Sequence, residues 1–263
     1  MKRIACAGDS CVDSYDELGI VYPGGNPVNV AVYIRRLGGE VSFVGAVGDD
    51  AFGEIVTKSL KRKGIDISHV QELHGLTPVS YVRTENGNRI FVDYDEGIMT
   101  DYVPTEDDLQ FLLSHDLVVS DLWGHLEPYL GRIRDAGVPV AYDCADLPFC
   151  KTSLLALPHT DIAFFSDDEA SDRKIRQLIR KVASYGPKIV VAMRGATGSI
   201  AFDGRRYHTC AAVPCEVVDT LGAGDSFIAG FLLAHLNGKP IRECMQLGAE
   251  NAAVTISYRG AWE

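Results

Sequence analysis

The sequence lacks long apolar runs, closely paired cysteines and a surplus of basic residues, and each absence excludes a class of protein. No apolar stretch approaches the ~20 residues that a membrane-spanning helix needs. The seven cysteines include no C-x-x-C pair and no Cys/His group with zinc-ligand spacing, so we expect reduced thiols and small apolar fillers. Acidic residues outnumber basic ones, and the net charge of -11 argues against nucleic acid as a partner.

A secretion signal is also missing from the first residues. The apolar stretch that follows Lys2 and Arg3 is too short for a signal peptide, and Gly8 and Asp9 end it. We therefore expect a cytoplasmic protein that binds no membrane. Its 263 residues are 46% hydrophobic, which is enough to bury a large core.

Strand-like and helix-like stretches alternate along most of the chain. Apolar runs predict strands at 2–8, 40–48, 116–122, 138–143, 161–166 and 188–195. Helical spacing of apolar residues predicts helices at 26–38, 51–64, 126–136, 168–184, 223–237 and 240–257. This alternation predicts an α/β fold with a mostly parallel central sheet and helices on both of its faces.

Two predicted hairpins interrupt the alternation. Residues 77–102 read as two strands around an Asn86-Gly87 turn, and a second pair of strands flanks Asp203-Gly204. The first hairpin is either a lid that stands off the main sheet or an antiparallel strand pair at its edge. The pattern alone favours neither interpretation.

The stretch VDTLGAGDSFIAGF, residues 218–231, joins a glycine-rich loop to an apolar helix. We expect residues 216–220 to end a strand. Glycines at a helix N-terminus leave backbone N–H groups open to a ligand, and the helix dipole favours an anion there. Asp225 is unexpected at such a site. It is either a helix N-cap or a base that accepts the proton of a hydroxyl as phosphate is transferred to it.

Other nucleotide-binding motifs are absent. The sequence has no G-x-x-x-x-G-K-[ST] motif and none of the protein-kinase motif set. GATG at 195–198 and GDSCVD at 8–13 lack the glycine spacing of a dinucleotide fingerprint. These absences argue against a P-loop enzyme and against a Rossmann oxidoreductase.

Several motifs together resemble one family. DTLGAGD at 219–225 is similar to the D-T-x-G-A-G-D signature of the ribokinase-like (pfkB) carbohydrate kinases, and GGNPVNVA at 24–31 resembles their N-terminal motif. VGDDAFG at 47–53, RGATGSIAFDG at 194–204 and GAENAAVTISYRGAW at 248–262 follow in the family's order. The resemblance implies a ribokinase-like three-layer α/β/α sandwich. It implies one domain over residues 1–263, with a small β lid from about 14–23 and 77–102.

Shorter strings narrow the resemblance within the family. GDSCVD at 8–13, DYDEGIM at 93–99, WGH at 123–125 and the final GAW are similar to kinases of sugar–amino acid (Amadori) adducts. This resemblance implies ATP-dependent phosphorylation of the 6-hydroxyl of fructoselysine or a related fructose–amino acid. Another sugar or a nucleoside remains an alternative substrate. A non-catalytic sugar- or nucleotide-binding regulator remains an alternative of another class.

The resemblance also implies roles for individual residues. Asp225 matches the family's general base, and Ala223 and Gly224, with the N–H of Asp225, match the anion hole. Gly222 is a further catalytic candidate. Sugar contacts are implied for Asp13, which matches an acid at the end of the first strand, and for Gly24, Gly25 and Asn29. Asn26 and Asn29 also suit helix caps, and Asn29 is favoured for the substrate. On the lid, the candidates for the amino acid part of the substrate are Arg89, Phe91, Tyr94 and Glu96.

The remaining implied contacts are to the nucleotide and to cations. The ATP candidates are Arg194, Gly195, Gly198, Gly222, Gly224 and Asn251. Glu169 matches a residue linked to Mg²⁺ through water, although Ser166 stands where the family has Asn. Asp219 and the loop near Gly260 resemble a monovalent-cation site, which suggests K⁺.

Two points stay open from the sequence. Trp123, His125 and Asp143 follow predicted strands, where they suit either a ligand site or a structural role. A homodimer formed through the lid is possible within this fold, and the sequence does not decide the oligomeric state.

Overall fold

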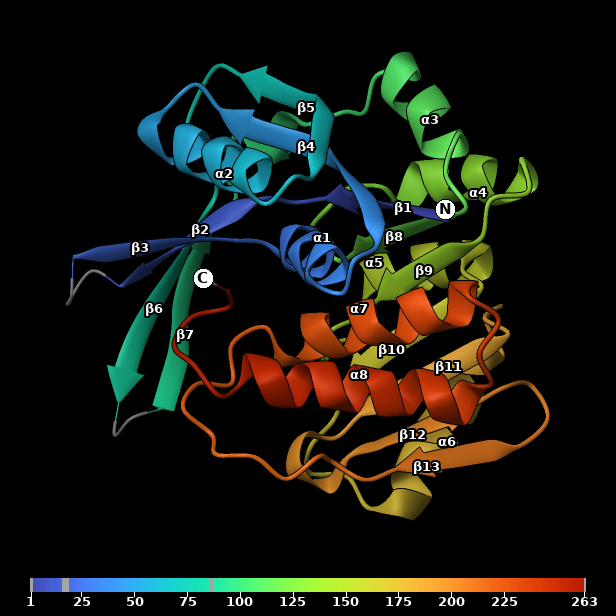
Figure 1. Ribbon diagram of the computed structural model, residues 1–263. Coiled ribbons are helices and arrows are strands. Elements are labelled where there is room, and N and C mark those ends of the chain that lie inside the picture. The colour runs from blue at the N-terminus through green and yellow to red at the C-terminus, as the bar shows by residue number, and fades with distance from the viewer. Residues whose placement is uncertain (1, 16–18, 86–87, 263) are drawn as a thin grey trace.

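The computed structural model describes residues 2–15, 19–85 and 88–262, with side chains left out at 84, 85 and 88–91. Its centre is a nine-stranded sheet in the order β13-β12-β11-β10-β9-β8-β1-β4-β5 (Figure 1). All neighbours are parallel except β12 with β11 and β13, which are antiparallel. The strands are β1 Arg3–Gly8, β4 Glu40–Gly48, β5 Asp66–Leu73, β8 Leu117–Asp121, β9 Val140–Asp143, β10 Ile162–Ser166, β11 Ile189–Met193, β12 Ser199–Phe202 and β13 Tyr207–Cys210.

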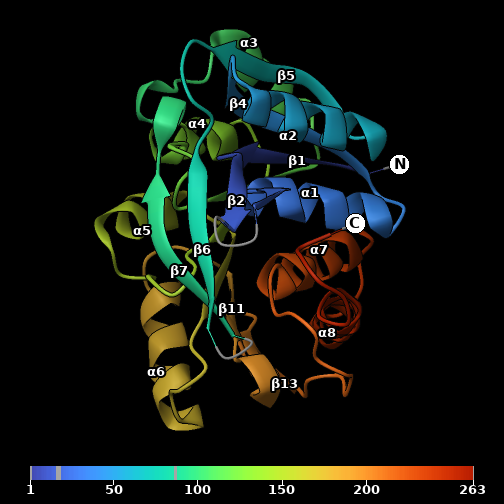
Figure 2. The same cartoon turned by 90° about the vertical axis from the view of Figure 1, so that its left-hand side faces the viewer.

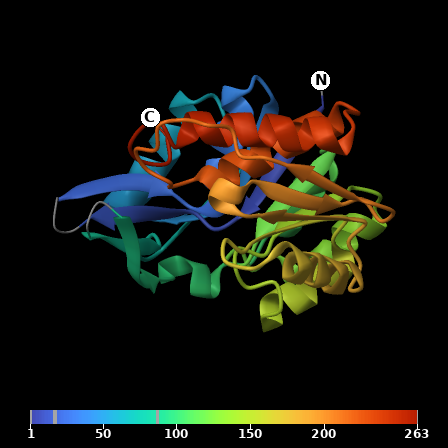
Figure 3. The same cartoon turned by 90° about the horizontal axis from the view of Figure 1, so that it is seen from below.

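Helices cover both faces of this sheet, as the view in Figure 3 shows. One face carries α1 Asn26–Arg36, α2 Ala51–Arg62, α7 Ala223–Leu236 and α8 Ile241–Thr255. The other carries α3 Glu106–Leu113, α4 Glu127–Asp135, α5 Lys151–Ala156 and α6 Asp172–Ala183. Short 3-10 helices lie at Gly97–Asp101, Leu157–His159 and Gly195–Thr197. Each helix layer buries its own apolar cluster against the sheet, so the fold is the predicted three-layer α/β/α sandwich.

A second sheet of four strands stands beside the main one. Its order is β3-β2-β6-β7, with β2 Cys11–Tyr15, β3 Ile20–Gly24, β6 Val79–Glu85 and β7 Asn88–Asp95. The long β6–β7 hairpin projects from the body of the molecule (Figure 2). The hairpin expected at 77–102 therefore forms, and it pairs with β2 and not with the edge of the main sheet. The turn Asn86-Gly87 and part of the expected lid at 14–23 lie outside the described residues.

Three expectations from the sequence are wrong in detail. Residues 216–220 end no strand: positions 211–217 are irregular, and the Val218 N–H binds the carbonyl of Ile256 across the chain. Helix α6 begins at Asp172 and not at 168, because Ser171 is its N-cap. Asp13 does not end the first strand, since the chain leaves β1 at Gly8 and Asp13 lies within β2. Within the described residues, no helix has the length and apolar content to span a bilayer.

Candidate active site

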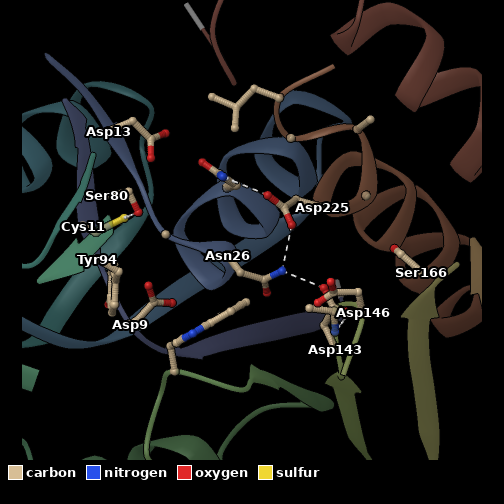
Figure 4. A pocket seen from close by; sticks show the side chains of 18 of the residues that line it. Asp9, Cys11, Asp13, Asn26, Ser80, Tyr94, Asp143, Asp146, Ser166 and Asp225 are labelled. Carbon is tan, nitrogen blue, oxygen red and sulfur yellow. Dashed lines mark hydrogen bonds between the residues drawn. The ribbon is translucent and has the colours of Figure 1, made fainter. Parts of the chain in front are cut away.

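A cavity of about 770 Å³ opens where the carboxyl ends of the central strands face the second sheet. Ligands of open α/β sheets collect at this edge. Its walls come from the β1–β2 connection, the start of α1, β7, the end of β9 and the start of α7. Segments distant in sequence therefore meet around one space, and Figure 4 shows their polar side chains directed into it.

Helix α7 places Asp225 in this cavity, in the first turn of the helix. Its N-cap is Gly222, in the left-handed conformation at φ 71°, so Asp225 is not the N-cap considered from the sequence. A Cβ on Gly222 would lie 2.2 Å from the hydroxyl of Tyr33, so both conformation and packing require glycine. First-turn N–H groups have no carbonyl partner inside their helix, and they border the cavity here with Gly222, Ala223 and Gly224. Such a helix N-terminus is suited to an anion, and the Asp225 carboxylate lies beside it.

Two asparagines from α1 hold the Asp225 carboxylate. Asn26 Nδ2 donates to Oδ1 at 2.7 Å and Asn29 Nδ2 donates to Oδ2 at 2.8 Å. Asn26 also donates to Asp143 Oδ2 at 2.7 Å, which links the ends of α1, α7 and β9 (Figure 4). The indole N–H of Trp262 donates to Asn29 Oδ1 at 2.8 Å. Each oxygen of the Asp225 carboxylate thus accepts one hydrogen bond that orients it, and the residue still lines the cavity.

The electrostatic surroundings of the Asp225 carboxylate suit it to accept a proton. Burial raises the pKa of Asp225 well above its ordinary value, and the nearby charge of Asp143 adds to the rise. The hydrogen bond from Asn29 acts in the opposite direction. Burial also raises the pKa of Asp143, to about 6. A carboxylate with a raised pKa is a stronger base than a solvated one, which suits proton abstraction from a hydroxyl.

The expected sugar contacts come from β2, from the residues just before α1 and from α1 itself. Asp13 is buried on β2, and a Cβ on Gly24 would approach its Oδ2 to 2.9 Å. Gly25 lines the cavity at φ 103°, where a side chain would be strained. Asn29 lines it from α1. The structure therefore brings Asp13, Gly25 and Asn29 to the same space as Asp225, with Gly24 packed against Asp13.

The residues expected to contact the substrate from the lid differ in where they lie. Tyr94 lines the cavity from β7, and its hydroxyl has no hydrogen-bond partner among the described residues. Glu96 is exposed and precedes the 3-10 helix at Gly97–Asp101, outside the cavity wall. Arg89 and Phe91 belong to β7, but their side chains lie outside the described part of the chain.

The expected nucleotide residues lie around the neighbouring strand ends. Ser166 lines the cavity, whereas Arg194 is bound by Asp172 at 2.8 Å and by the Ala170 carbonyl at 3.3 Å. Gly195 and Gly198 both have positive φ, and a Cβ on Gly198 would overlap the Cys210 carbonyl. These glycines shape the turn between β11 and β12.

The remaining three expected contacts are away from the cavity wall. The Asn251 side chain lies between α8 and α7, donating to the Ser226 carbonyl at 2.7 Å and accepting from Arg36 at 2.6 Å. Glu169 is exposed in the turn before α6. Asp219 accepts the backbone N–H groups of Leu221 and Gly260, and so joins the loop before α7 to the end of the chain.

Sequence reasoning left some site residues undecided or missed them. Asn26 suited a cap and Asp143 suited either role, yet both belong to the hydrogen-bonded group around Asp225. Asp9 and Asp146 line the cavity and were not proposed for it. Their signal was available, because each follows closely on the carboxyl end of a central strand.

Comparison with known proteins agrees with this geometry. The family model described as pfkB family carbohydrate kinase matches residues 19–263. The chain belongs to the pfkB family of carbohydrate kinases. It is 40% identical over 262 residues to fructoselysine 6-kinase of Shigella flexneri, covering all of both chains. It is 35% identical to fructosamine kinase FrlD of Bacillus subtilis, covering all of this chain and 93% of that one.

Solved structures of the family share the fold. Arabidopsis thaliana ribokinase, complexed with ribose and ATP, superposes with a TM-score of 0.86 at 22% identity, covering 99% of this chain and 94% of that one. Thermotoga maritima ribokinase gives a TM-score of 0.83 at 19% identity, covering 99% and 95%. The protein is therefore a sugar kinase with the ribokinase fold, and ATP use is typical of its family. A non-catalytic regulator and an oxidoreductase are not favoured.

Proposed function

We propose that this protein transfers the γ-phosphoryl group of ATP to the 6-hydroxyl of fructoselysine or a closely related fructose–amino acid. The observation that carries the substrate is the 40% identity to fructoselysine 6-kinase over the whole of both chains. The chemistry is supported by the Asp225 carboxylate, which is held by two amides at the N-terminus of α7.

The proposed reaction uses the geometry of the cavity directly. Asp13 accepts hydrogen bonds from sugar hydroxyls, with Gly24, Gly25 and Asn29 completing the sugar contacts. The 6-hydroxyl then faces Asp225, which accepts its proton as the oxygen attacks the γ-phosphorus. The N–H groups of Ala223, Gly224 and Asp225, in the first turn of α7, stabilise the charge that develops on the transferred group, with the Ala223 N–H exchanging its present bond to the Thr220 carbonyl.

The nucleotide is proposed to lie along the strand ends beside Ser166 and Met193, both of which line the cavity. Gly195 and Gly198 leave room for it in the β11–β12 turn. Arg194 would contact its phosphates only by exchanging its present bond to Asp172. Asn251 is proposed to support the adenine side indirectly, by joining α8 to α7.

Two cations are proposed. Mg²⁺ keeps several waters and is held by few carboxylates, which fits Glu169 and the adjacent Asp168. Burial and the charges of Asp167 and Glu169 raise the pKa of Asp168, so a cation would be favoured among these carboxylates. When bound, Mg²⁺ neutralises phosphate charge. K⁺ is proposed at the loop that Asp219 joins to Gly260, where backbone carbonyls would bind it.

The second sheet is proposed as a small lid within one domain over residues 1–263. Tyr94 reaches the cavity from β7, which supports this role. Arg89, Phe91 and Glu96 remain proposed contacts of the lid with the amino acid part of the substrate. A homodimer through the lid is proposed on the exposed apolar side chains Ile20 and Val92. We also propose a cytoplasmic location, where ATP is available, and neither nucleic acid nor membrane as a partner of this acidic chain.

The decisive experiment is a substrate panel with MgATP and coupled detection of ADP. The panel contains fructoselysine, fructose-asparagine, glucoselysine, fructose, ribose and adenosine. We expect the highest kcat/KM with fructoselysine or another fructose–amino acid, and ³¹P NMR of the product to show a phosphate on carbon 6. Asp225→Asn should lose roughly 10²- to 10⁴-fold in kcat while retaining ATP binding. Highest turnover on a plain sugar or nucleoside would reject the proposed substrate and leave the kinase chemistry standing.

A further inference from the structure

One carboxyl group of the cavity has no part in the reaction described above. Asp9 follows β1 and borders the cavity, yet only 3% of its surface is exposed. Its Oδ1 has no hydrogen-bond partner among the described residues. A buried carboxylate oxygen without a donor is costly, so a site of this kind calls for a ligand that supplies one.

The groups around Asp9 strengthen the argument that this site binds a ligand. Asp121, at the end of β8, is fully buried next to Asp9, and it hydrogen-bonds to the Asp9 carboxyl group and to the backbone of Trp123. Burial raises the pKa of Asp9 to about 6 and that of Asp121 well above its ordinary value, and the charge of Asp9 contributes to the second rise. A hydrogen bond between the two groups lowers the pKa of Asp9 and raises that of Asp121, so Asp121 holds the proton and Asp9 carries the negative charge on the cavity side. That charge attracts a positively charged group.

Backbone geometry fixes this pair in place. Gly8 has φ 147°, and a Cβ there would lie 2.8 Å from Asp121 Oδ1. A Cβ on Gly124 would come within 2.5 Å of the Gly8 Cα, so the two backbones pass each other too closely for any side chain. His125, immediately after, has φ 54°, which is uncommon for a residue other than glycine. The close approach of β1 and the segment after β8 is what brings Asp9 and Asp121 together.

The rest of the cavity wall agrees with a cationic ligand. The described residues that line it include six aspartates and neither lysine, arginine nor histidine. The aspartates are Asp9, Asp13, Asp93, Asp143, Asp146 and Asp225. No group of three His, Cys, Asp or Glu side chains among the described residues is arranged to hold a metal ion. An acidic wall of this kind favours a cationic ligand.

The place of Asp9 relative to Asp225 suits one end of a substrate. Figure 4 shows Asp9 and Tyr94 together on one side, Asp225 and Asp143 on the other, and Asn26 between them. A sugar whose reacting hydroxyl faces Asp225 therefore directs its opposite end toward Asp9. In a fructose–amino acid the group at that end is a protonated amine on carbon 1.

We propose that Asp9, supported by the neighbouring Asp121, is the specificity residue that binds the protonated amine on carbon 1 of the substrate. The Tyr94 hydroxyl, which has no hydrogen-bond partner within the described part of the chain, closes the same subsite from β7. Asp9 takes no part in phosphoryl transfer, so its effect is on the choice between aminated and neutral sugars. This inference rests on the proposed function, because it assigns a residue to the amine of that substrate.

The test compares two sugars that differ only at carbon 1, namely 1-amino-1-deoxyfructose and fructose. We expect the wild-type protein to prefer the amine in kcat/KM. Asp9→Asn keeps the shape and removes the charge, and we expect it to lower kcat/KM for the amine by about 10- to 100-fold. Turnover of fructose should fall by clearly less than turnover of the amine, because a neutral hydroxyl loses less than a cation when the charge of Asp9 is removed. Thermal unfolding shows whether the variant is folded. Asp135→Asn, at the exposed end of α4, is the control for loss of one negative charge far from the cavity.

The possible failures are distinguishable. If the wild-type protein prefers the amine and Asp9→Asn keeps that preference, the assignment of Asp9 is wrong while the proposed function stands. If the wild-type protein phosphorylates fructose and shows no preference for any amine, both are wrong. A structure of the wild-type protein with 1-amino-1-deoxyfructose gives the answer even if the variant does not fold. We expect the nitrogen within hydrogen-bond distance of Asp9, and a nitrogen bound by other aspartates instead would overturn the proposal.

Discussion

The indole N–H of Trp262 donates to Asn29 Oδ1 at 2.8 Å, and this single bond determines which way the Asn29 amide faces. With the oxygen engaged by Trp262, the Nδ2 group is directed at Asp225 Oδ2. The last turn of the chain thereby orients a side chain on α1, and α1 orients the proposed base on α7. An amide held from one side only could rotate and present its oxygen to the carboxylate, which would be repulsive.

Trp262→Phe tests this orientation. The phenyl ring retains apolar packing beside Lys63, whose ammonium lies 5.6 Å from the indole ring, but it offers no N–H. We expect kcat to fall about three- to tenfold, the loss that one hydrogen bond of ordinary strength predicts. Steady-state kinetics and thermal unfolding of the same preparation check it. An unchanged kcat with an unchanged melting temperature would show that the hydrogen bond from Trp262 is not required to orient the Asn29 amide.

The pH dependence of kcat/KM tests the electrostatics around the base. The raised pKa of Asp225 predicts a limb on the acid side, because only the ionised carboxylate accepts the proton. Asp143 contributes to that rise through its negative charge. Asp143→Asn removes the charge, favours ionised Asp225 and should move the acid limb to lower pH. Rate profiles of the variant and the wild-type protein, measured with saturating ATP, give the comparison.

A second variant should move the same limb in the opposite direction. Asn29→Ala removes a donor that stabilises the charged form of Asp225, so its pKa should rise and the limb should move to higher pH. The variant also loses a sugar contact, which raises KM without moving the limb. Shifts of the two variants in the same direction would contradict the assignment of the limb to Asp225.

Stability should depend on pH through Asp143. Burial raises its pKa from 3.8 to about 6, so the folded state binds this proton more tightly than the unfolded chain. Its favourable contribution is complete below pH 3.8 and is lost as the pH rises through about 6. Asp143→Asn should therefore gain stability relative to wild type on going from pH 4 to pH 7, by up to about 3 kcal/mol. Urea unfolding at both values measures the difference, and an equal effect of the variant at both would reject it.

The sequence was sufficient for the parts of the molecule that local pattern controls. Strand β11, and β10 as far as Phe165, are unbroken apolar runs because both of their faces are buried, and that pattern can be read from the sequence alone. The glycines before Asp225 marked an anion site because a left-handed residue and an open backbone both require glycine.

Contacts between residues that are distant in the sequence left no pattern from which they could be predicted. Asn26 meets Asp143 and Asp225 across 117 and 199 residues, and nothing in the sequence near Asn26 distinguishes this from capping. Asp9 and Asp121 come together only because Gly8 and Gly124 let two backbones approach. Residues 216–220 have the composition of a strand but find no neighbouring strand, and their backbone instead bonds to the end of α8. Such outcomes depend on tertiary packing, which overrides local preference.

The contact between Gly222 and Tyr33 supports a final prediction. Gly222→Ala places a methyl group 2.2 Å from the Tyr33 hydroxyl in a left-handed conformation, so we expect a loss of about 1–3 kcal/mol in stability and a large fall in kcat. Tyr33→Phe removes that oxygen, although it also removes the hydrogen bond to the Ala261 carbonyl. The two changes should therefore not add: in the Tyr33→Phe background, Gly222→Ala should cost clearly less than in wild type. Urea unfolding of the four proteins gives the coupling. Strict additivity would mean that backbone strain at Gly222, and not the clash with Tyr33, accounts for the whole effect.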